Sequence, residues 1–199
     1  LVGAPAPRDC GGCPCPGGVT RGVIFMRADS SGYLAEQVEK ALQNYGRTTA
    51  IDLRSDEEWA RQHSKLDKVT GVTLHRVYLL DQLNSSNFEG DLPGSMSGLY
   101  ISLLENNAAD LVRICTILAD AEGCSLFNCT AGKDRTGVVA MLLLNLAGVN
   151  DADVEADYSV TEIYMRNVFM RELDALKGLP VPEYVFRSLP ESMRRVLQH

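Results

Sequence analysis

The sequence predicts an α/β fold in which helices flank a central, largely parallel sheet. Short runs of β-branched and apolar residues, typical of buried strands, alternate with longer segments whose apolar residues recur at helical spacing. This alternation is typical of parallel sheets, whose ligand sites lie beyond the carboxyl ends of the strands. The length of 199 residues, with 45% hydrophobic and 23% charged residues, suits a soluble globular protein. We therefore expect one domain over residues 1–199.

The predicted strands begin only after the first tenth of the chain. Residues 1–21 are dominated by Gly, Pro and Cys without a helical or alternating period, so they predict a loop-rich arm. The runs that follow are rich in apolar and β-branched residues, which fit a buried pleated surface. The predicted strands are residues 22–26, 48–53, 72–78 and 124–128.

Helical patterns occupy most of the segments between and after these strands. Ser55 is a typical N-cap for a short acidic helix that begins at residue 56. The apolar spacing over residues 98–121 fits either one long helix or two helices joined near residues 106–107. The other predicted helices are residues 33–45, 136–147, 151–177 and a short one after Pro190.

Composition excludes some classes of partner. The formal net charge of -7 argues against non-specific binding of nucleic acid, which requires basic surface. No window has the roughly 18 apolar residues that cross a bilayer, so we expect no stable membrane insertion. The chain begins at Leu1 without a charged and then apolar leader, which leaves its location open between cytoplasmic and secreted.

The six cysteines are distributed unevenly. Cys10, Cys13 and Cys15 crowd the predicted arm, and the other three lie in apolar segments. Cys10 and Cys13 have the two-residue gap of some zinc sites, but no paired histidines supply further ligands. We therefore expect reduced thiols, no bound metal and no cofactor.

A thiol and an arginine bracket residues 129–135, between a predicted strand and a predicted helix. In a tight loop that leads into a helix, backbone N–H groups form a nest for a phosphate dianion and favour a thiolate. Gly132 permits the tight backbone, and Arg135 offers a planar fork for two phosphoryl oxygens. The hydroxyl of Thr136 can donate to the thiolate and help it leave. The pattern predicts a phosphatase with Cys129 as nucleophile.

The stretch Cys-Thr-Ala-Gly-Lys-Asp-Arg-Thr-Gly at residues 129–137 resembles the signature of cysteine-dependent protein tyrosine phosphatases, and most resembles their bacterial, lipid-phosphatase-like branch. Residues 50–58, residues 8–12, and Asp157-Tyr158 with Thr161 resemble further motifs of that branch. The resemblance implies a tyrosine-phosphatase-like fold and hydrolysis through a phosphocysteine. The residues it implicates are Cys129, Asp134, Arg135 and Thr136 in catalysis and Thr130, Ala131, Gly132 and Lys133 in substrate binding.

Two positions depart from the family pattern. Asn128 precedes the nucleophile where the family usually has His, which alters the usual support of the loop and the thiolate. Residues 27–30, Arg-Ala-Asp-Ser, depart from the family's Arg-Ser pair, which leaves the role of Arg27 open.

Two aspartates compete for the general acid that protonates the leaving oxygen. Related phosphatases with Asp before the loop arginine imply Asp134, which needs no loop closure. The alternative is Asp81, at the start of a polar stretch, residues 81–98, that is long enough for a substrate-facing loop. We favour Asp134.

The expected substrates are phosphorylated. The Lys133-Asp134 pair resembles loops that also accept phosphoinositides, so phosphotyrosine, phosphoserine or phosphothreonine, and phosphoinositides stay open, with phosphate as product or inhibitor. The alternative is a non-catalytic phosphate-binding module with a phosphatase fold, suggested by Asn128. Sulfur transfer of the rhodanese kind also uses a loop cysteine, but the spacing to Arg135 fits phosphate better.

Several charged and aromatic residues receive a structural interpretation. We expect Asp52 and Arg54 to pair behind the loop, and Glu57 and Glu58 to serve as charges in the first turn of a helix. Tyr100 is assigned no role, because single aromatic residues are more often core anchors.

Overall fold

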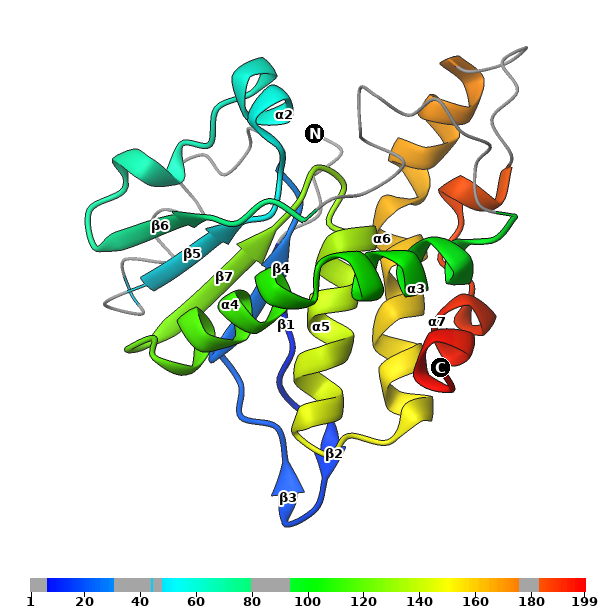
Figure 1. Cartoon of the computed structure of the whole chain (residues 1–199), viewed down its shortest axis with the longest axis horizontal. Coiled ribbons are helices and arrows are strands. Elements are labelled where there is room, and N and C mark those ends of the chain that lie inside the picture. Colours follow the sequence, from blue (N-terminus) through cyan, green and yellow to red (C-terminus); the bar gives the residue numbers. More distant parts are fainter. Residues whose placement is uncertain (1–6, 31–43, 45–47, 80–93, 176–182) are drawn as a thin grey trace.

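The computed structural model describes residues 7–30, 44, 48–79, 94–175 and 183–199. In Figure 1 these residues form a twisted sheet with a layer of helices packed against it. The helix predicted over residues 33–45 lies outside the described residues except for residue 44. Asp81 and most of the predicted loop 81–98 also lie outside them.

The central sheet has five strands in the order β1-β4-β7-β5-β6. Strands β4, β7, β5 and β6 run parallel, while β1 pairs with β4 in the antiparallel direction, which confirms the largely parallel sheet. The register places Ala28, Asn128, Asp52 and Arg76 side by side where the parallel strands end. The strands are β1 (Arg8–Asp9), β4 (Phe25–Ala28), β7 (Cys124–Asn128), β5 (Thr48–Asp52) and β6 (Val72–Arg76).

The helical layer is built around α5 (Asp134–Leu146), which contacts β4 and β7 on one side and α3 and α6 on the other (Figure 1). Helix α5 is buried over most of its length, as its apolar sequence predicts. The remaining elements are α2 (Asp56–Arg61), η1 (Leu66–Lys68), α3 (Met96–Asn106), α4 (Ala108–Ala119), α6 (Asp151–Ala175), η2 (Glu183–Phe186) and α7 (Pro190–Leu197). No helix among the described residues has both the length and the apolar composition needed to cross a membrane.

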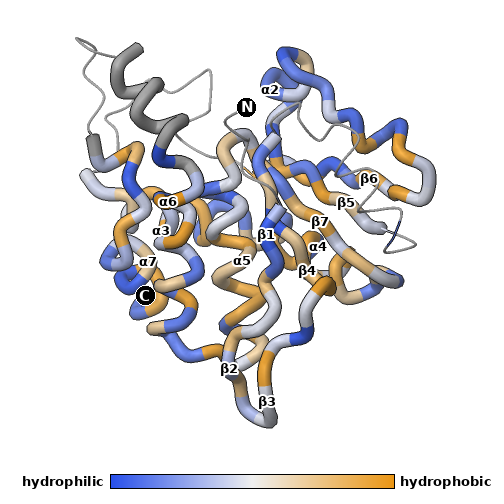
Figure 2. Tube along the Cα trace, turned by 180° about the vertical axis from the view of Figure 1, so that it is seen from behind, coloured by the Kyte–Doolittle hydropathy of each residue, from blue (hydrophilic) through white to orange (hydrophobic). Residues whose placement is uncertain are grey.

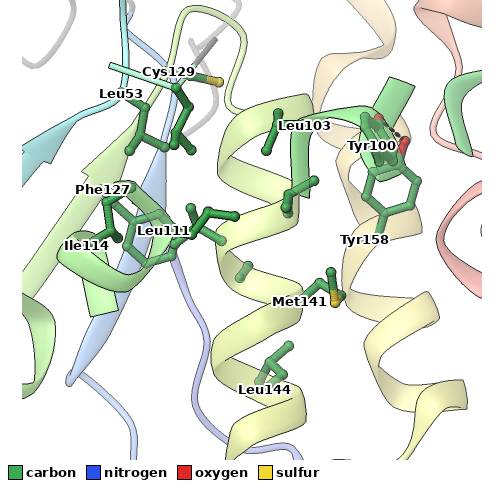
Figure 3. Close-up of a cluster of buried hydrophobic side chains, with 14 of the residues drawn as sticks. Leu53, Tyr100, Leu103, Leu111, Ile114, Phe127, Cys129, Met141, Leu144 and Tyr158 are labelled. Carbon is green, nitrogen blue, oxygen red and sulfur yellow. Dashed lines mark hydrogen bonds between the residues drawn. The ribbon is translucent and has the colours of Figure 1, made fainter. Parts of the chain in front are cut away.

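The main hydrophobic core lies between the sheet and helices α3, α4, α5, α6 and α7 (Figure 3). Phe127 of β7, Ile114 of α4 and Tyr100 of α3 are fully buried in it. A smaller cluster, formed by Ala28, Ala50, Leu66 and Leu126, lies on the opposite face of the sheet. Apolar residues are concentrated in the central strands and α5, whereas α2 is largely hydrophilic (Figure 2). The β7 strand is therefore buried on both faces, and all five of its residues are buried, including the polar Ser125 and Asn128.

The predicted loop-rich arm contains short strands. One is β1. The other two, β2 (Pro14–Cys15) and β3 (Gly18–Val19), pair with each other as a two-stranded hairpin. Strands of two residues are too short for an alternating pattern, so sequence periodicity does not predict them.

The segment predicted as residues 98–121 is two helices, which confirms the second of the two alternatives. They are separated at Asn107, whose side chain donates to the Leu103 carbonyl at 2.9 Å. Helix α3 begins before residue 98 because the Ser95 side chain accepts a hydrogen bond from the Gly98 N–H at 3.2 Å. The predicted loop 81–98 therefore ends at Ser95 rather than at residue 98.

The two faces of α4 predict a contrast in stability. Ile114→Ala should lower the free energy of unfolding by about 2 to 5 kcal/mol, because the fully buried side chain leaves a cavity. Val112→Ala on the same helix should change it by less than about 0.5 kcal/mol, because Val112 is 66% exposed. Urea unfolding measures both values, and equal losses would contradict the assignment of the buried face.

Candidate active site

Residues 129–133 join the end of the central strand β7 to α5, and Asp134 and Arg135 are the first two residues of that helix. The Leu53 N–H donates to the Asn128 carbonyl at 2.9 Å, so β5 and β7 stay paired up to the point where the loop begins. Cys129 follows at once, beside Leu53 and beyond Phe127 in Figure 3, and is buried. The loop therefore lies at the carboxyl edge of the sheet, which is where the sequence predicts a ligand site.

Gly132 is required by the shape of this loop. Its φ of +67° lies in the left-handed region, and a Cβ there would come within 2.8 Å of the Ala28 carbonyl oxygen. The loop therefore packs directly against the end of β4. On the same side, Arg27 donates to the Gly132 carbonyl at 3.2 Å, and Ser30 donates through its N–H and hydroxyl to the Thr130 carbonyl.

Arg27, whose role the sequence left open, links the loop to helix α6. Its buried guanidinium forms an ion pair with Asp157 of α6 at 2.6 Å. Arg8 of β1 donates to the Asp157 carbonyl at 3.1 Å and to the Thr161 hydroxyl at 3.0 Å. Residue 8 is far from residues 157 and 161 in the sequence but contacts both in the fold. This group is connected to Gly132 through Arg27.

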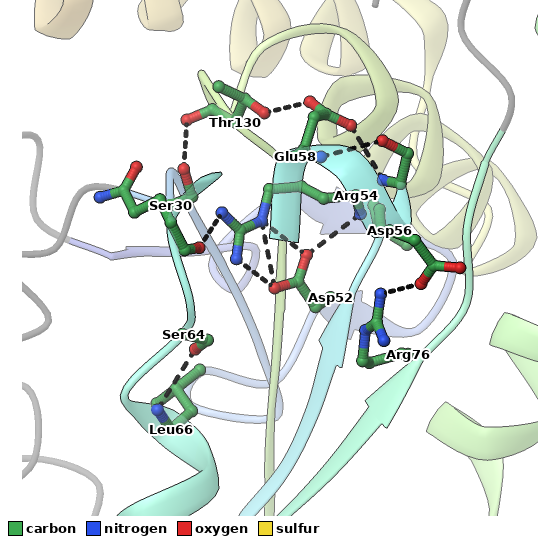
Figure 4. A network of polar contacts seen from close by, with 12 residues as sticks. Ser30, Asp52, Arg54, Asp56, Glu58, Ser64, Leu66, Arg76 and Thr130 are labelled. Carbon is green, nitrogen blue, oxygen red and sulfur yellow. Dashed lines mark hydrogen bonds and ion pairs between the residues drawn. The ribbon is translucent and has the colours of Figure 1, made fainter. Parts of the chain in front are cut away.

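Glu58 holds the guanidinium of Arg135. Each carboxylate oxygen of Glu58 accepts a hydrogen bond from one terminal nitrogen of Arg135, both at 2.7 Å. The Thr130 hydroxyl also donates to Glu58, as Figure 4 shows. The interpretation of Glu58 as a helix charge is therefore incomplete: it forms a capping box with Ser55 and also fixes the loop arginine.

The electrostatics of Glu58 reflect this contact. Burial by itself raises the pKa of Glu58, but the hydrogen bonds and charge of Arg135 outweigh it. Hydrogen bonds from Thr130 and from the Ser55 N–H add to the effect, and the pKa is lowered to about 2. Glu58 is therefore ionised at neutral pH and neutralises the buried Arg135.

Asp52 and Arg54 pair at the end of β5, as expected. Arg54 Nη2 lies 2.7 Å from Asp52 Oδ2, and its Nε donates to Asp52 Oδ1 at 2.9 Å (Figure 4). Arg54 also donates to the Gln62 carbonyl at 2.9 Å, beyond the end of α2. This buried pair therefore holds the segment that carries Glu58 rather than pointing a charge into the loop.

The neighbouring loop residues Lys133 and Asp134 face the helical layer. Lys133 Nζ lies 3.2 Å from Asp134 Oδ1, and it donates to the carbonyls of Val185 and Arg187. Lys133 is buried, whereas the side chain of Asp134 keeps 13% of its exposure. The hydroxyl of Tyr100 donates to Asp134 Oδ1 at 2.7 Å, so a residue assigned no role from the sequence contacts the candidate acid.

The other predicted residues also gather at the loop. Thr136 is buried in the first turn of α5, and its hydroxyl has no hydrogen-bond partner among the described residues. Asn128 is buried at the end of β7. Ala131 is half-buried within the loop. The structure therefore brings every described candidate together, while Asp81 lies outside the described residues.

Burial disfavours the thiolate form of four cysteines outside the loop. Burial raises the pKa of the Cys10 thiol to about 12 and that of Cys124 to about 11. Burial also raises the pKa of Cys13 and Cys115. All of these cysteines are free thiols. Those with raised pKa values stay protonated at neutral pH, where a thiol is a poor nucleophile.

Comparison with known proteins agrees with the fold. The whole chain, residues 1–199, matches the sequence model of the tyrosine phosphatase family. The chain therefore belongs to the tyrosine phosphatase family, which confirms the family that the loop resembles.

Two relatives carry the same family name. A tyrosine-protein phosphatase of Nostoc commune is 30% identical over 164 residues, which cover 80% of this chain and 56% of that protein. A protein of Cupriavidus necator assigned as a tyrosine-protein phosphatase is 28% identical over 195 residues, which cover 92% of this chain and 70% of that protein. The chain thus spans little more than half of the Nostoc protein.

The contact between Glu58 and Arg135 predicts a pH-dependent stability. Because the pKa of Glu58 is lower in the folded protein, its ionised form stabilises the fold above about pH 4.5 and this contribution is lost as the pH falls toward 2. Glu58→Gln should lower the free energy of unfolding by about 2 kcal/mol at pH 7, allowing for solvent near the carboxylate.

The matched control is the exposed neighbour on the same helix. Glu57→Gln should change the free energy of unfolding by less than about 0.5 kcal/mol. Urea unfolding between pH 7 and pH 3 measures both variants. The difference between wild type and Glu58→Gln should shrink as the pH falls below about 4.5, and a difference independent of pH would contradict the ionic contact.

Proposed function

We propose that this chain is a phosphomonoester hydrolase that acts through a phosphocysteine and uses no metal. The observation that carries the proposal is the placement of Cys129 directly after β7 and of Arg135 in the first turn of α5, at the two ends of one connection. The guanidinium is already oriented by Glu58. Membership of the tyrosine phosphatase family supports the same chemistry.

In the first step, the Cys129 thiolate attacks phosphorus and the bond from phosphorus to the ester oxygen breaks. The loop N–H groups and Arg135 bind the phosphoryl oxygens, and their fixed positions stabilise the charge of the transition state. A guanidinium has five N–H donors, more than one carboxylate can accept, so contact with Glu58 is compatible with contact to phosphate. Asp134, the proposed general acid, donates its proton to the leaving oxygen.

In the second step, water attacks the phosphorus of the phosphocysteine. Asp134, now a carboxylate, takes a proton from the water, and the bond from sulfur to phosphorus breaks. The Thr136 hydroxyl, buried next to the loop, stabilises the departing thiolate. Phosphate leaves as the product and acts as a competitive inhibitor.

The substrates we propose are of the phosphotyrosine type. The two named relatives are tyrosine-protein phosphatases, which supports this class. Phosphoserine, phosphothreonine and phosphoinositides stay secondary candidates. The charge of Lys133 would favour phosphoinositides if its amino group contacted the substrate. That amino group instead donates to two backbone carbonyls near η2. This arrangement favours phosphotyrosine-type substrates over more highly charged ones.

The nucleophile is tested by Cys129→Ser. This variant should lose hydrolysis of p-nitrophenyl phosphate by at least about 1,000-fold while inorganic phosphate still binds, because the loop N–H groups and Arg135 remain. Wild-type activity should be unchanged by a chelator. Activity retained by Cys129→Ser would overturn the mechanism, and an inactive wild type that binds phosphate would favour the non-catalytic module suggested by Asn128.

The general acid is tested by Asp134→Asn. An acid matters most for a poor leaving group, so the variant should slow an alkyl phosphate about 100-fold and an activated aryl phosphate only a few-fold. Steady-state kcat values on the two substrates make the comparison. Equal slowing would contradict Asp134 as the acid and would favour Asp81.

A further inference from the structure

Two buried tyrosine hydroxyls form a hydrogen-bonded chain that ends on Asp134. Tyr100 donates to Asp134 Oδ1 at 2.7 Å, and the hydroxyl oxygens of Tyr100 and Tyr158 lie 2.6 Å apart. Their ring centroids lie 5.8 Å apart in an edge-to-face arrangement. Figure 3 shows the two side chains and the hydrogen bond between them. Helices α3, α6 and α5 each supply one member, so three elements converge on a single carboxylate.

The direction of each hydrogen bond between these three side chains follows from the number of protons available. A phenol has a single proton, and Tyr100 donates its proton to Asp134, so Tyr158 must be the donor to Tyr100. Burial raises the pKa of both phenols, and the charge of Asp134 raises it further. Both hydroxyls therefore remain protonated, and able to donate, across the pH range of an ordinary enzyme assay.

The contacts distinguish the two oxygens of the carboxylate. Oδ1 of Asp134 accepts from Tyr100 and lies 3.2 Å from Lys133 Nζ. None of the described residues donates to Oδ2, and the side chain is 13% exposed. Because Oδ1 already accepts other hydrogens, Oδ2 is the oxygen that is left to carry a transferable proton.

The hydroxyl of Tyr100 is not explained by packing. Its ring is fully buried in the main core, where the ring of phenylalanine would fill the same space. A buried hydroxyl is unfavourable unless it is hydrogen-bonded, and here its two partners are the candidate acid and a second tyrosine. The two tyrosine hydroxyls therefore serve the hydrogen bond to Asp134, whereas the rings fill the core.

We propose that Tyr100 is a positioning residue for the general acid. Its hydroxyl holds Oδ1 of Asp134, so that the proton resides on Oδ2 and reaches the leaving oxygen, while Tyr158 holds the hydroxyl of Tyr100. The proposal rests on the proposed function, because it requires Asp134 to protonate a leaving group.

The test compares two substrates that differ in their need for an acid. Tyr100→Phe should lower kcat for phenyl phosphate about 10-fold, because the acid is less well oriented toward a poor leaving group. The same variant should change kcat for 2,4-dinitrophenyl phosphate, and KM for both substrates, by less than about 2-fold.

Three further variants separate positioning from damage to the core. Tyr158→Phe should show the same selectivity with a smaller loss, because it acts through Tyr100. Tyr164→Phe, at an exposed tyrosine of α6, should leave both rates unchanged. The double variant of Tyr100→Phe and Asp134→Asn should be no slower than Asp134→Asn alone, because the two residues act as one unit.

The outcomes distinguish this proposal from the proposed function. Equal slowing of both substrates by Tyr100→Phe, no slowing of either, or additive losses in the double variant would overturn the positioning role while the phosphatase assignment stands. A wild-type protein that hydrolyses neither substrate would overturn the proposed function, and the positioning role with it.

Discussion

The bidentate contact between Glu58 and Arg135 is the interaction on which the rest of the site depends. A buried guanidinium is strongly unfavourable without a partner, and Arg135 has only 1% of its side chain exposed. Glu58 supplies the opposite charge while it caps α2 and accepts from Thr130. The segment after β5 and the loop after β7 therefore form one unit, and neither can move without breaking this contact.

Helix α6 supports the loop on the other side through two adjacent residues. Asp157 forms an ion pair with Arg27, which donates a hydrogen bond to the Gly132 carbonyl. Tyr158 forms a hydrogen bond with Tyr100, which donates to Asp134. Each connection passes through one intermediate side chain that is itself buried. Helix α6 therefore fixes both the backbone of the loop and the candidate acid, although none of its residues belongs to the signature.

Much of the architecture could be predicted because local composition reflects burial. Strand β7 has the bounds expected, since its short segment lies between Gly123, which ends the preceding helical pattern, and the loop that begins at Cys129. The short strands of the N-terminal arm could not be predicted, because two residues contain no period. The break between α3 and α4 was one of two alternatives, and the Asn107 contact to Leu103 shows which one the chain adopts.

The loop, the candidate nucleophile Cys129 and Arg135 could be predicted from the sequence, because these residues are close together in the chain and their spacing is a local pattern. The residues that contact this loop could be found only in the folded structure. Glu58 lies 77 residues from Arg135, and Tyr100 lies 34 residues from Asp134. Such pairs have no local period or spacing, and they meet only because parallel strands end at one edge and three helices pack against the same turn.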